Sequence, residues 1–186
     1  MTVVAELLQV IRGVTQGKLE RHAHCQRERW ADQKRGEPMS DEQNVWPAGM
    51  PEVGQRAELT REVSAQDIEM FTAISGDRNP LHYDAELAGK TKFGGIIVQG
   101  GITSAILNAV VAEKLPGPGT VFLHVDWNFK APVRPGDRIT GTVEVTKVRT
   151  DKPMTELKTT VTRDDGTVVL DGEAMCYTMP LPQRSA

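Results

Sequence analysis

Cysteine is scarce in this chain: among 186 residues only Cys25 and Cys176 occur. Two separated cysteines provide neither a disulfide framework nor the paired spacing of a zinc site. We therefore expect no metal, and free thiols suited to a reducing compartment such as the cytoplasm. Cys176 lies in a strand-like stretch, where we expect it to pack in the core rather than to act as a nucleophile.

Aromatic residues are few as well, at 5% of the chain, and they form no stripe with basic residues of the kind that binds single-stranded nucleic acid. The formal net charge is only −3, so no strong field attracts nucleic acid or an anionic membrane surface. No glycine-rich phosphate loop or nucleotide fingerprint is present either. We expect no nucleic-acid partner, no membrane partner and no cofactor.

Charged residues are missing from one stretch, residues 93–112, which is long enough to span a bilayer. Its first half, however, contains Gly94, Gly95, Gln99 and Gly100, and its second half contains Asn108. A helix buried in the core of a globular domain fits this composition better than a membrane span.

The N-terminal part of the chain differs in composition from the rest. Residues 18–35 are dense in charges of both signs, and Met39 is a plausible alternative start. We expect residues 1–45 to form an extension, helical or disordered. A single domain over residues 46–180 and a tail over 181–186 follow.

The first part of the domain predicts a strand and then a helix. Residues 54–63 alternate as a strand does. Ser64 and Asp67 have capping-box spacing, and Gly76 stands where a helix C-cap glycine belongs. Four apolar residues recur at every third position of this helix and predict one buried stripe: Ala65, Ile68, Phe71 and Ile74.

The second part predicts one long apolar helix over residues 98–114 and then about four strands. Asp164-Asp165-Gly166 marks a hairpin between the last two. This order predicts an α+β fold in which an antiparallel sheet wraps around a single central helix. The strand after the helix is predicted to alternate strictly, with five residues on one side: Val121, Leu123, Val125, Trp127 and Phe129.

The segment Asp77-Arg78-Asn79-Pro80-Leu81-His82 carries the strongest functional signal. An acid and an imidazole are suited to share one water molecule and to move its protons. Pro80 fixes its own φ and biases Asn79 away from the α region, so we expect an ordered turn rather than a helix. Such a turn can aim Asp77 and His82 into one cavity, although Asp-x-Asn-Pro also occurs as ordinary turn chemistry.

Two glycines, Gly100 and Gly101, precede the long apolar helix. Free N–H groups and the positive end of the helix dipole lie at a helix start, and they suit an oxygen that gains negative charge during a reaction. Close helix packing is the other reason for a glycine here, and the residues alone do not decide between the two.

Three segments together resemble the MaoC-like, (R)-specific enoyl-CoA hydratases. They are residues 76–84 (Gly-Asp-Arg-Asn-Pro-Leu-His-Tyr-Asp), residues 93–100 with Phe-Gly at the start and Val-Gln-Gly at the end, and residues 129–137 (Phe-Lys-Ala-Pro-Val-Arg-Pro-Gly-Asp). The first segment is the specific one and the others support it. The resemblance covers residues 54–178 and implies a hotdog fold, a homodimer and an acyl-CoA thioester substrate.

The resemblance also implies roles for individual residues. Asp77 and His82 activate a water that adds to a trans-2-enoyl-CoA and gives an (R)-3-hydroxyacyl-CoA. Asn79 holds this pair in place, and the N–H of Gly100 binds the thioester oxygen. Contacts with the substrate are expected from four residues near the pair and on the helix: Phe93, Gln99, Gly101 and Asn108.

The chain departs from the family at Gln99-Gly100, where His-Gly is common. Gln99 cannot titrate, which affects substrate preference more than the reaction itself. Two alternatives to the hydratase stay open: a 3-hydroxyacyl dehydratase acting on acyl carrier protein, and a hotdog module that binds acyl-CoA without catalysis. A hotdog thioesterase usually carries a carboxylate on its central helix, and residues 93–112 contain none. We expect a hydro-lyase acting on acyl-CoA.

Overall fold

The computed structural model describes residue 46 and residues 49–181, all of which belong to the second of the two units into which the chain divides, residues 43–186. The expectations about Cys25, about the extension over residues 1–45 and about the tail beyond residue 181 lie outside the described residues. The proposed domain boundaries therefore stay predictions.

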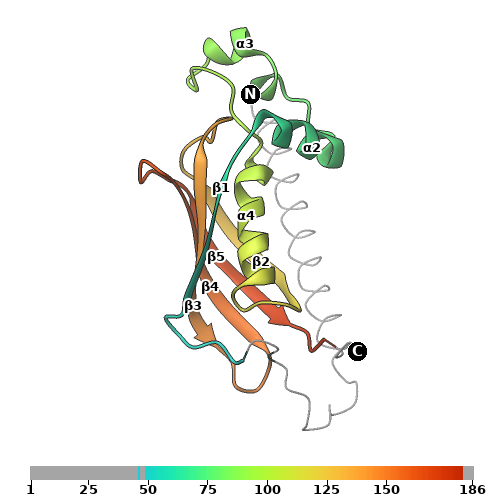
Figure 1. Ribbon diagram of the computed structural model, residues 1–186, viewed down its shortest axis with the longest axis vertical. Helices are drawn as coiled ribbons and strands as arrows, with labels where there is room; N and C mark the ends of the chain where they lie inside the picture. Colours follow the sequence, from blue (N-terminus) through green and yellow to red (C-terminus); the bar gives the residue numbers. More distant parts are fainter. Residues whose placement is uncertain (1–45, 47–48, 182–186) are drawn as a thin grey trace, which may run out of the picture. The chain divides into compact units, whose positions relative to one another are not determined.

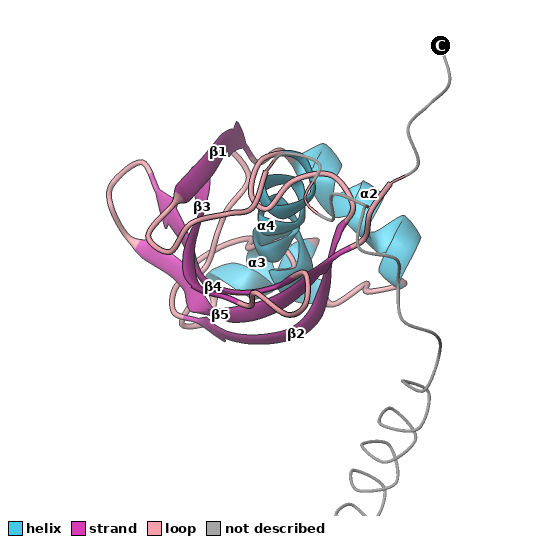
Figure 2. Ribbon diagram, turned by 90° about the horizontal axis from the view of Figure 1, so that it is seen from below, coloured by secondary structure: helices cyan, strands magenta, loops and turns pink. Residues whose placement is uncertain are grey.

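Five strands form one antiparallel sheet in the order β1-β3-β4-β5-β2, with α4 against one face (Figure 1). Seen along its strands, the sheet curves around α4 (Figure 2). The predicted α+β architecture, a sheet wrapped around one central helix, is confirmed. The elements are β1 (Arg56–Glu62), α2 (Ala65–Ser75), the 3₁₀ turn η1 (Pro80–His82), α3 (Ala85–Gly89), α4 (Gly100–Glu113), β2 (Thr120–Phe129), β3 (Arg138–Val148), β4 (Met154–Arg163) and β5 (Val168–Thr178).

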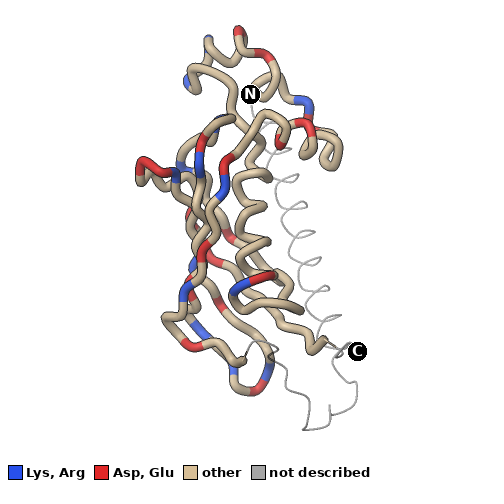
Figure 3. Tube along the Cα trace, viewed as in Figure 1, with Lys and Arg blue, Asp and Glu red and all other residues tan. Residues whose placement is uncertain are grey.

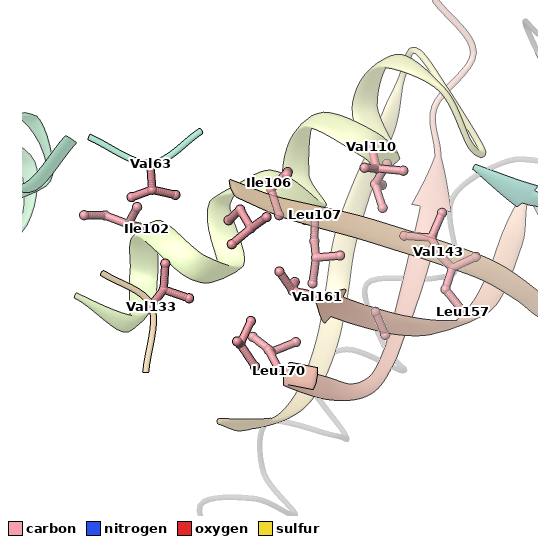
Figure 4. Close-up of a cluster of buried hydrophobic side chains, with 14 of the residues drawn as sticks. Val63, Ile102, Ile106, Leu107, Val110, Val133, Val143, Leu157, Val161 and Leu170 are labelled. Atoms are coloured by element: carbon pink, nitrogen blue, oxygen red, sulfur yellow. The ribbon is translucent and has the colours of Figure 1, made fainter. Parts of the chain in front are cut away.

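Helix α4 lies at the centre of the core. It can be buried there because it carries no charged residue before its last, Glu113 (Figure 3). Its buried side chains meet the inner face of the sheet: Leu107 and Val110 lie among Val143, Leu157 and others (Figure 4). Each such side chain stabilises the fold by about 1.5–3 kcal/mol when fully buried. None of the described helices is long and apolar enough to cross a bilayer.

Helix α2 starts and ends as the sequence predicts. The buried carboxylate of Asp67 accepts hydrogen bonds from the N–H of Ser64 (2.7 Å) and from its hydroxyl (3.0 Å), and it pairs with Arg61. Burial alone would raise the pKa of Asp67, but the bonds from Ser64 and Arg61 outweigh it and hold the pKa below its usual value. Gly76 caps the C-terminus with φ of 75°.

The predicted buried stripe on α2 is wrong at both ends. Ile68 is buried and Phe71 packs partly against the core, but Ala65 is exposed and Ile74 is 85% exposed. With 3.6 residues per turn, a strict three-residue repeat rotates off the buried face, and positions nine apart lie on opposite sides of the helix. The buried face carries Thr72 instead, in line with Ile68.

Strand β2 forms one edge of the sheet, and its pairing with β5 shifts between Phe122 and His124. This bulge breaks the predicted strict alternation, because an extra residue moves the following side chains to the other face. Val125 and Phe129 lie opposite Ala174 and Leu170, which are buried in the core, yet both are exposed. The edge therefore leaves apolar side chains uncovered.

Candidate active site

The Asp77–His82 segment is an ordered turn held by its own side chains. Oδ1 of Asp77 accepts a hydrogen bond from the N–H of Asn79 (3.0 Å), and Oδ1 of Asn79 accepts one from the N–H of Leu81 (3.1 Å). Pro80 then starts the single turn η1, which ends at His82. The segment folds so that Oδ2 of Asp77 lies 3.5 Å from Nε2 of His82.

A hydrogen bond from the other ring nitrogen fixes the orientation of His82. Nδ1 lies 2.7 Å from the carbonyl oxygen of Ile97. Since a carbonyl oxygen only accepts, Nδ1 carries the hydrogen, and in the neutral ring the lone pair is on Nε2. The side chain of His82 is 8% exposed and that of Asp77 40% exposed. Nε2 thus faces a carboxylate that solvent can reach, which is the arrangement expected for a base acting on a bound water.

The start of α4 is tied to the same turn. The N–H of Ile97 donates to the carbonyl of Leu81 (3.2 Å), next to the bond that Ile97 receives from His82. Gly100, three residues on, is the first residue of α4. No described residue accepts a hydrogen bond from its N–H, and a Cβ there would lie 3.2 Å from the ring of Phe129. The helix start thus offers a donor three residues after the carbonyl that binds His82.

The structure brings together most of the predicted site residues, but not all of them. Asn79 holds the turn, and Gln99 is 1% exposed, with its side chain directed to Thr72. Gly101 lies against the ring of Phe71, so its lack of a side chain has a packing reason. Asn108 is exposed and more than two helical turns beyond Gly100.

Arg134, in the 129–137 segment, links that segment to the loop before α4. Its guanidinium donates to the carbonyl oxygens of Ile96 (3.1 Å) and Phe93. Its own N–H donates to Asp137 (2.8 Å) in the tight turn that residues 134–137 form. Arg134 thereby fixes the loop that leads into α4. Phe93, which was expected to contact the substrate, accepts the bond from Arg134 through its main-chain carbonyl.

Thr72 is a buried polar residue beside the Asp77–His82 turn that the sequence did not single out. It is buried and bonded to both Gln99 and the main chain of Asp77. Its four-residue spacing from Ile68 was the available signal for a buried position. Among residue 46 and residues 49–181, no group of three His, Cys, Asp or Glu side chains could hold a metal ion.

Comparisons with known proteins agree with this geometry. A model of the MaoC like domain family matches residues 48–167. The (R)-specific enoyl-CoA hydratase of Aeromonas caviae is 39% identical over 124 residues, which cover 67% of this chain and 92% of that protein. The 3-hydroxybutyryl-CoA dehydratase of Methylorubrum extorquens is 41% identical over 124 residues, covering 67% and 78%.

A solved structure extends the similarity to three dimensions. The (R)-hydratase from A. caviae involved in PHA biosynthesis aligns with a TM-score of 0.66 at 38% sequence identity, and the alignment covers 69% of this chain and 97% of that chain. The sequence matches and the structural match point to the same family. The chain belongs to the MaoC-like domain family and has its hotdog fold.

Proposed function

We propose that this protein is an (R)-specific enoyl-CoA hydratase, which adds water reversibly to a trans-2-enoyl-CoA and gives an (R)-3-hydroxyacyl-CoA. The observation that carries the proposal is the pairing of Asp77 with a His82 whose Nδ1 is bonded to a carbonyl, so that Nε2 is left to act as a base. Relatives named for this reaction and for its reverse support it.

The proposed hydration moves one proton through the pair. Nε2 of His82 takes a proton from the water as the water oxygen bonds to C3 of the substrate. The carboxylate of Asp77 orients the water and relays that proton to C2, so the product gains the elements of water and both side chains return to their starting states. The opposite division, with Asp77 as the base and His82 as the donor, balances equally. Each acid–base element contributes typically about 10²–10⁴-fold.

The charge that develops on the thioester oxygen needs a donor, and the N–H of Gly100 is our proposal for it. It lies at the positive end of a 14-residue helix. One such donor is worth about 10²–10³-fold. A pure acyl-CoA-binding module is the less favoured alternative, because binding alone does not require an acid 3.5 Å from a histidine.

We also propose that the protein is a homodimer that pairs through β2. This strand is an edge of the sheet, so one row of its main-chain groups has no neighbouring strand within residues 49–181. Its uncovered apolar side chains support the same contact: Val121, Leu123, Val125 and Phe129. Because the ring of Phe129 also lies against Gly100, a partner at this edge would reach the proposed site.

A cytoplasmic location is proposed from the buried thiol. Cys176 is free and fully buried, and burial raises its pKa to about 12. Such a thiol is inert, and an unpaired cysteine in the core suits a reducing compartment.

The test of function uses purified protein and crotonyl-CoA, followed by the loss of absorbance of the enoyl thioester and by chiral analysis of the product. We expect an (R)-3-hydroxy product. Octenoyl-CoA and a crotonyl group on acyl carrier protein are assayed in parallel. Turnover of the carrier-linked substrate alone would replace the proposal with the dehydratase alternative, and tight binding without turnover of any of them would indicate a binding module.

A further inference from the structure

A hydrogen-bond network lies beside the Asp77–His82 turn and is centred on the buried Thr72 of α2, which the proposed mechanism does not use. The hydroxyl of Thr72 lies 2.8 Å from the carbonyl oxygen of Asp77 and 3.0 Å from Nε2 of Gln99, and the hydroxyl of Tyr83 donates to it as well. Thr72 is 4% exposed. One hydroxyl thus joins three segments that are separate in the sequence.

The direction of every bond in this network is determined. A threonine hydroxyl has one hydrogen to donate and two lone pairs to accept with. The carbonyl of Asp77 only accepts, so it takes the hydrogen of Thr72. Gln99 must therefore present its NH₂ group, and Tyr83 its O–H. The hydroxyl of Thr72 thus uses its hydrogen and both of its lone pairs, so its bonds have one arrangement.

The two members of the proposed catalytic pair are held by one short segment, Ile97–Gln99. The carbonyl of Ile97 binds Nδ1 of His82, and the side chain of Gln99 binds Thr72, which in turn binds the main chain of Asp77. Gly100 follows directly. The same stretch of chain therefore relates the acid, the base and the proposed oxyanion donor.

We propose that Thr72 and Gln99 are positioning residues, which fix the main chain of Asp77 and so hold its carboxylate 3.5 Å from Nε2 of His82. The inference rests on the proposed function in taking these two as the reacting pair. Apart from Thr72, the links to Asp77 are local ones: its N–H donates to Ser75 (3.1 Å), and its carboxylate accepts from Asn79. Both are exposed bonds at the surface, whereas the link through Thr72 reaches the core.

Glutamine suits this position chemically. Its amide is an uncharged donor at every pH, so the link to Thr72 does not change when nearby groups titrate. A histidine at position 99 would titrate near neutral pH and would make the same link depend on pH.

The experiment compares Thr72→Val, which keeps the shape and removes the hydroxyl, with Thr72→Ser, which keeps the hydroxyl. Thr72→Val is expected to lower kcat by about 10- to 100-fold, because a displacement of about 1 Å in a reacting group has that size of effect. KM for crotonyl-CoA should change by less than about threefold, and Thr72→Ser should recover most of the lost kcat. Thr178→Val is the matched control, since it removes a buried threonine hydroxyl bonded to Thr120. Thr120 begins β2, whereas Phe129, which lies against Gly100, ends it.

Two outcomes would overturn the inference. Unchanged kcat in Thr72→Val would show that the hydroxyl does not position Asp77, and a loss in Thr72→Ser as large as in Thr72→Val would assign the effect to packing. Gln99→Met, which removes the amide at similar volume, should lower kcat in the same way and replaces Thr72→Val if that variant does not fold.

A crystal structure of the variant separates this inference from the proposed function. It should show the carboxylate of Asp77 displaced beyond 4 Å from Nε2 of His82, and an unchanged 3.5 Å would refute positioning even in a protein that turns over no enoyl thioester. If the wild type turned over none of the substrates, the proposed hydratase function would be refuted, while the position of Asp77 in the crystal structure of the variant would still test the positioning role.

Discussion

Gly100 and Gly101 are neighbours at the start of α4, yet the structure predicts very different effects of adding one methyl group. A Cβ on Gly101 would lie 2.1 Å from Cζ of Phe71, whereas a Cβ on Gly100 would lie 3.2 Å from the ring of Phe129. Carbon atoms pack at about 3.5–4.0 Å. The Phe71 ring must therefore retreat by more than about 1 Å, while the exposed ring of Phe129 needs only a few tenths.

The magnitude follows from two opposing effects. Alanine is favoured over glycine inside a helix by about 1 kcal/mol. Overpacking costs about 1–3 kcal/mol, and the severe overlap with Phe71 places Gly101→Ala in the upper half of that range. The net loss should be about 1–2 kcal/mol. Gly100→Ala, at the helix start and beside an exposed ring, should stay within about 0.5 kcal/mol of the wild type.

The assay is urea unfolding of both variants and the wild type at one protein concentration, with the slope m checked for constancy. Gly101→Ala should also unfold at a temperature about 2–8 °C lower. Phe71→Leu in the Gly101→Ala background should recover part of the loss, as a double-mutant cycle would show. A Gly101→Ala protein as stable as the wild type, or less affected than Gly100→Ala, would refute the packing argument.

Three further predictions concern stability, loop geometry and assembly. Asp67→Asn should lower the free energy of unfolding by about 1–2 kcal/mol at neutral pH, because it weakens the bonds from Ser64. Since the pKa of Asp67 is lowered in the folded protein, the difference from the wild type is present above about pH 4 and should vanish as the pH falls below it. Urea titrations at several pH values measure this difference. Arg134→Lys cannot bind both carbonyls of the 93–96 loop, so kcat/KM should fall by about tenfold, and wild-type kinetics would contradict that role. Val125→Lys on the uncovered edge should yield monomers in analytical ultracentrifugation, and an unchanged dimer would place the interface elsewhere.

Local sequence patterns predicted the parts of the fold whose cause is local. The long uncharged run predicted α4, because a helix surrounded by a sheet has no place for charge. Pro80 predicted the turn that brings Asp77 near His82, since it restricts its own φ and that of Asn79. Gly76 marked the end of α2 through its left-handed conformation.

The failures have equally specific causes. The stripe on α2 failed because a period of three is not the period of a helix, and the alternation on β2 failed at a bulge that no residue type announces. The bonds of His82 to Ile97 and of Gln99 to Thr72 join segments far apart in the sequence. The partner of His82 is a main-chain carbonyl, which every residue has, so that bond leaves no mark in the sequence.

The central claim, that Asp77 and His82 act on one water as a unit, is tested most directly by the turnover of crotonyl-CoA by Asp77→Asn, by His82→Ala and by the double variant. Groups that act together are strongly non-additive. The account predicts a loss of at least about 10²-fold in each single variant, with circular dichroism unchanged, and a double variant within about tenfold of the worse single one. Wild-type turnover in either single variant, or losses that multiply in the double variant, would contradict it.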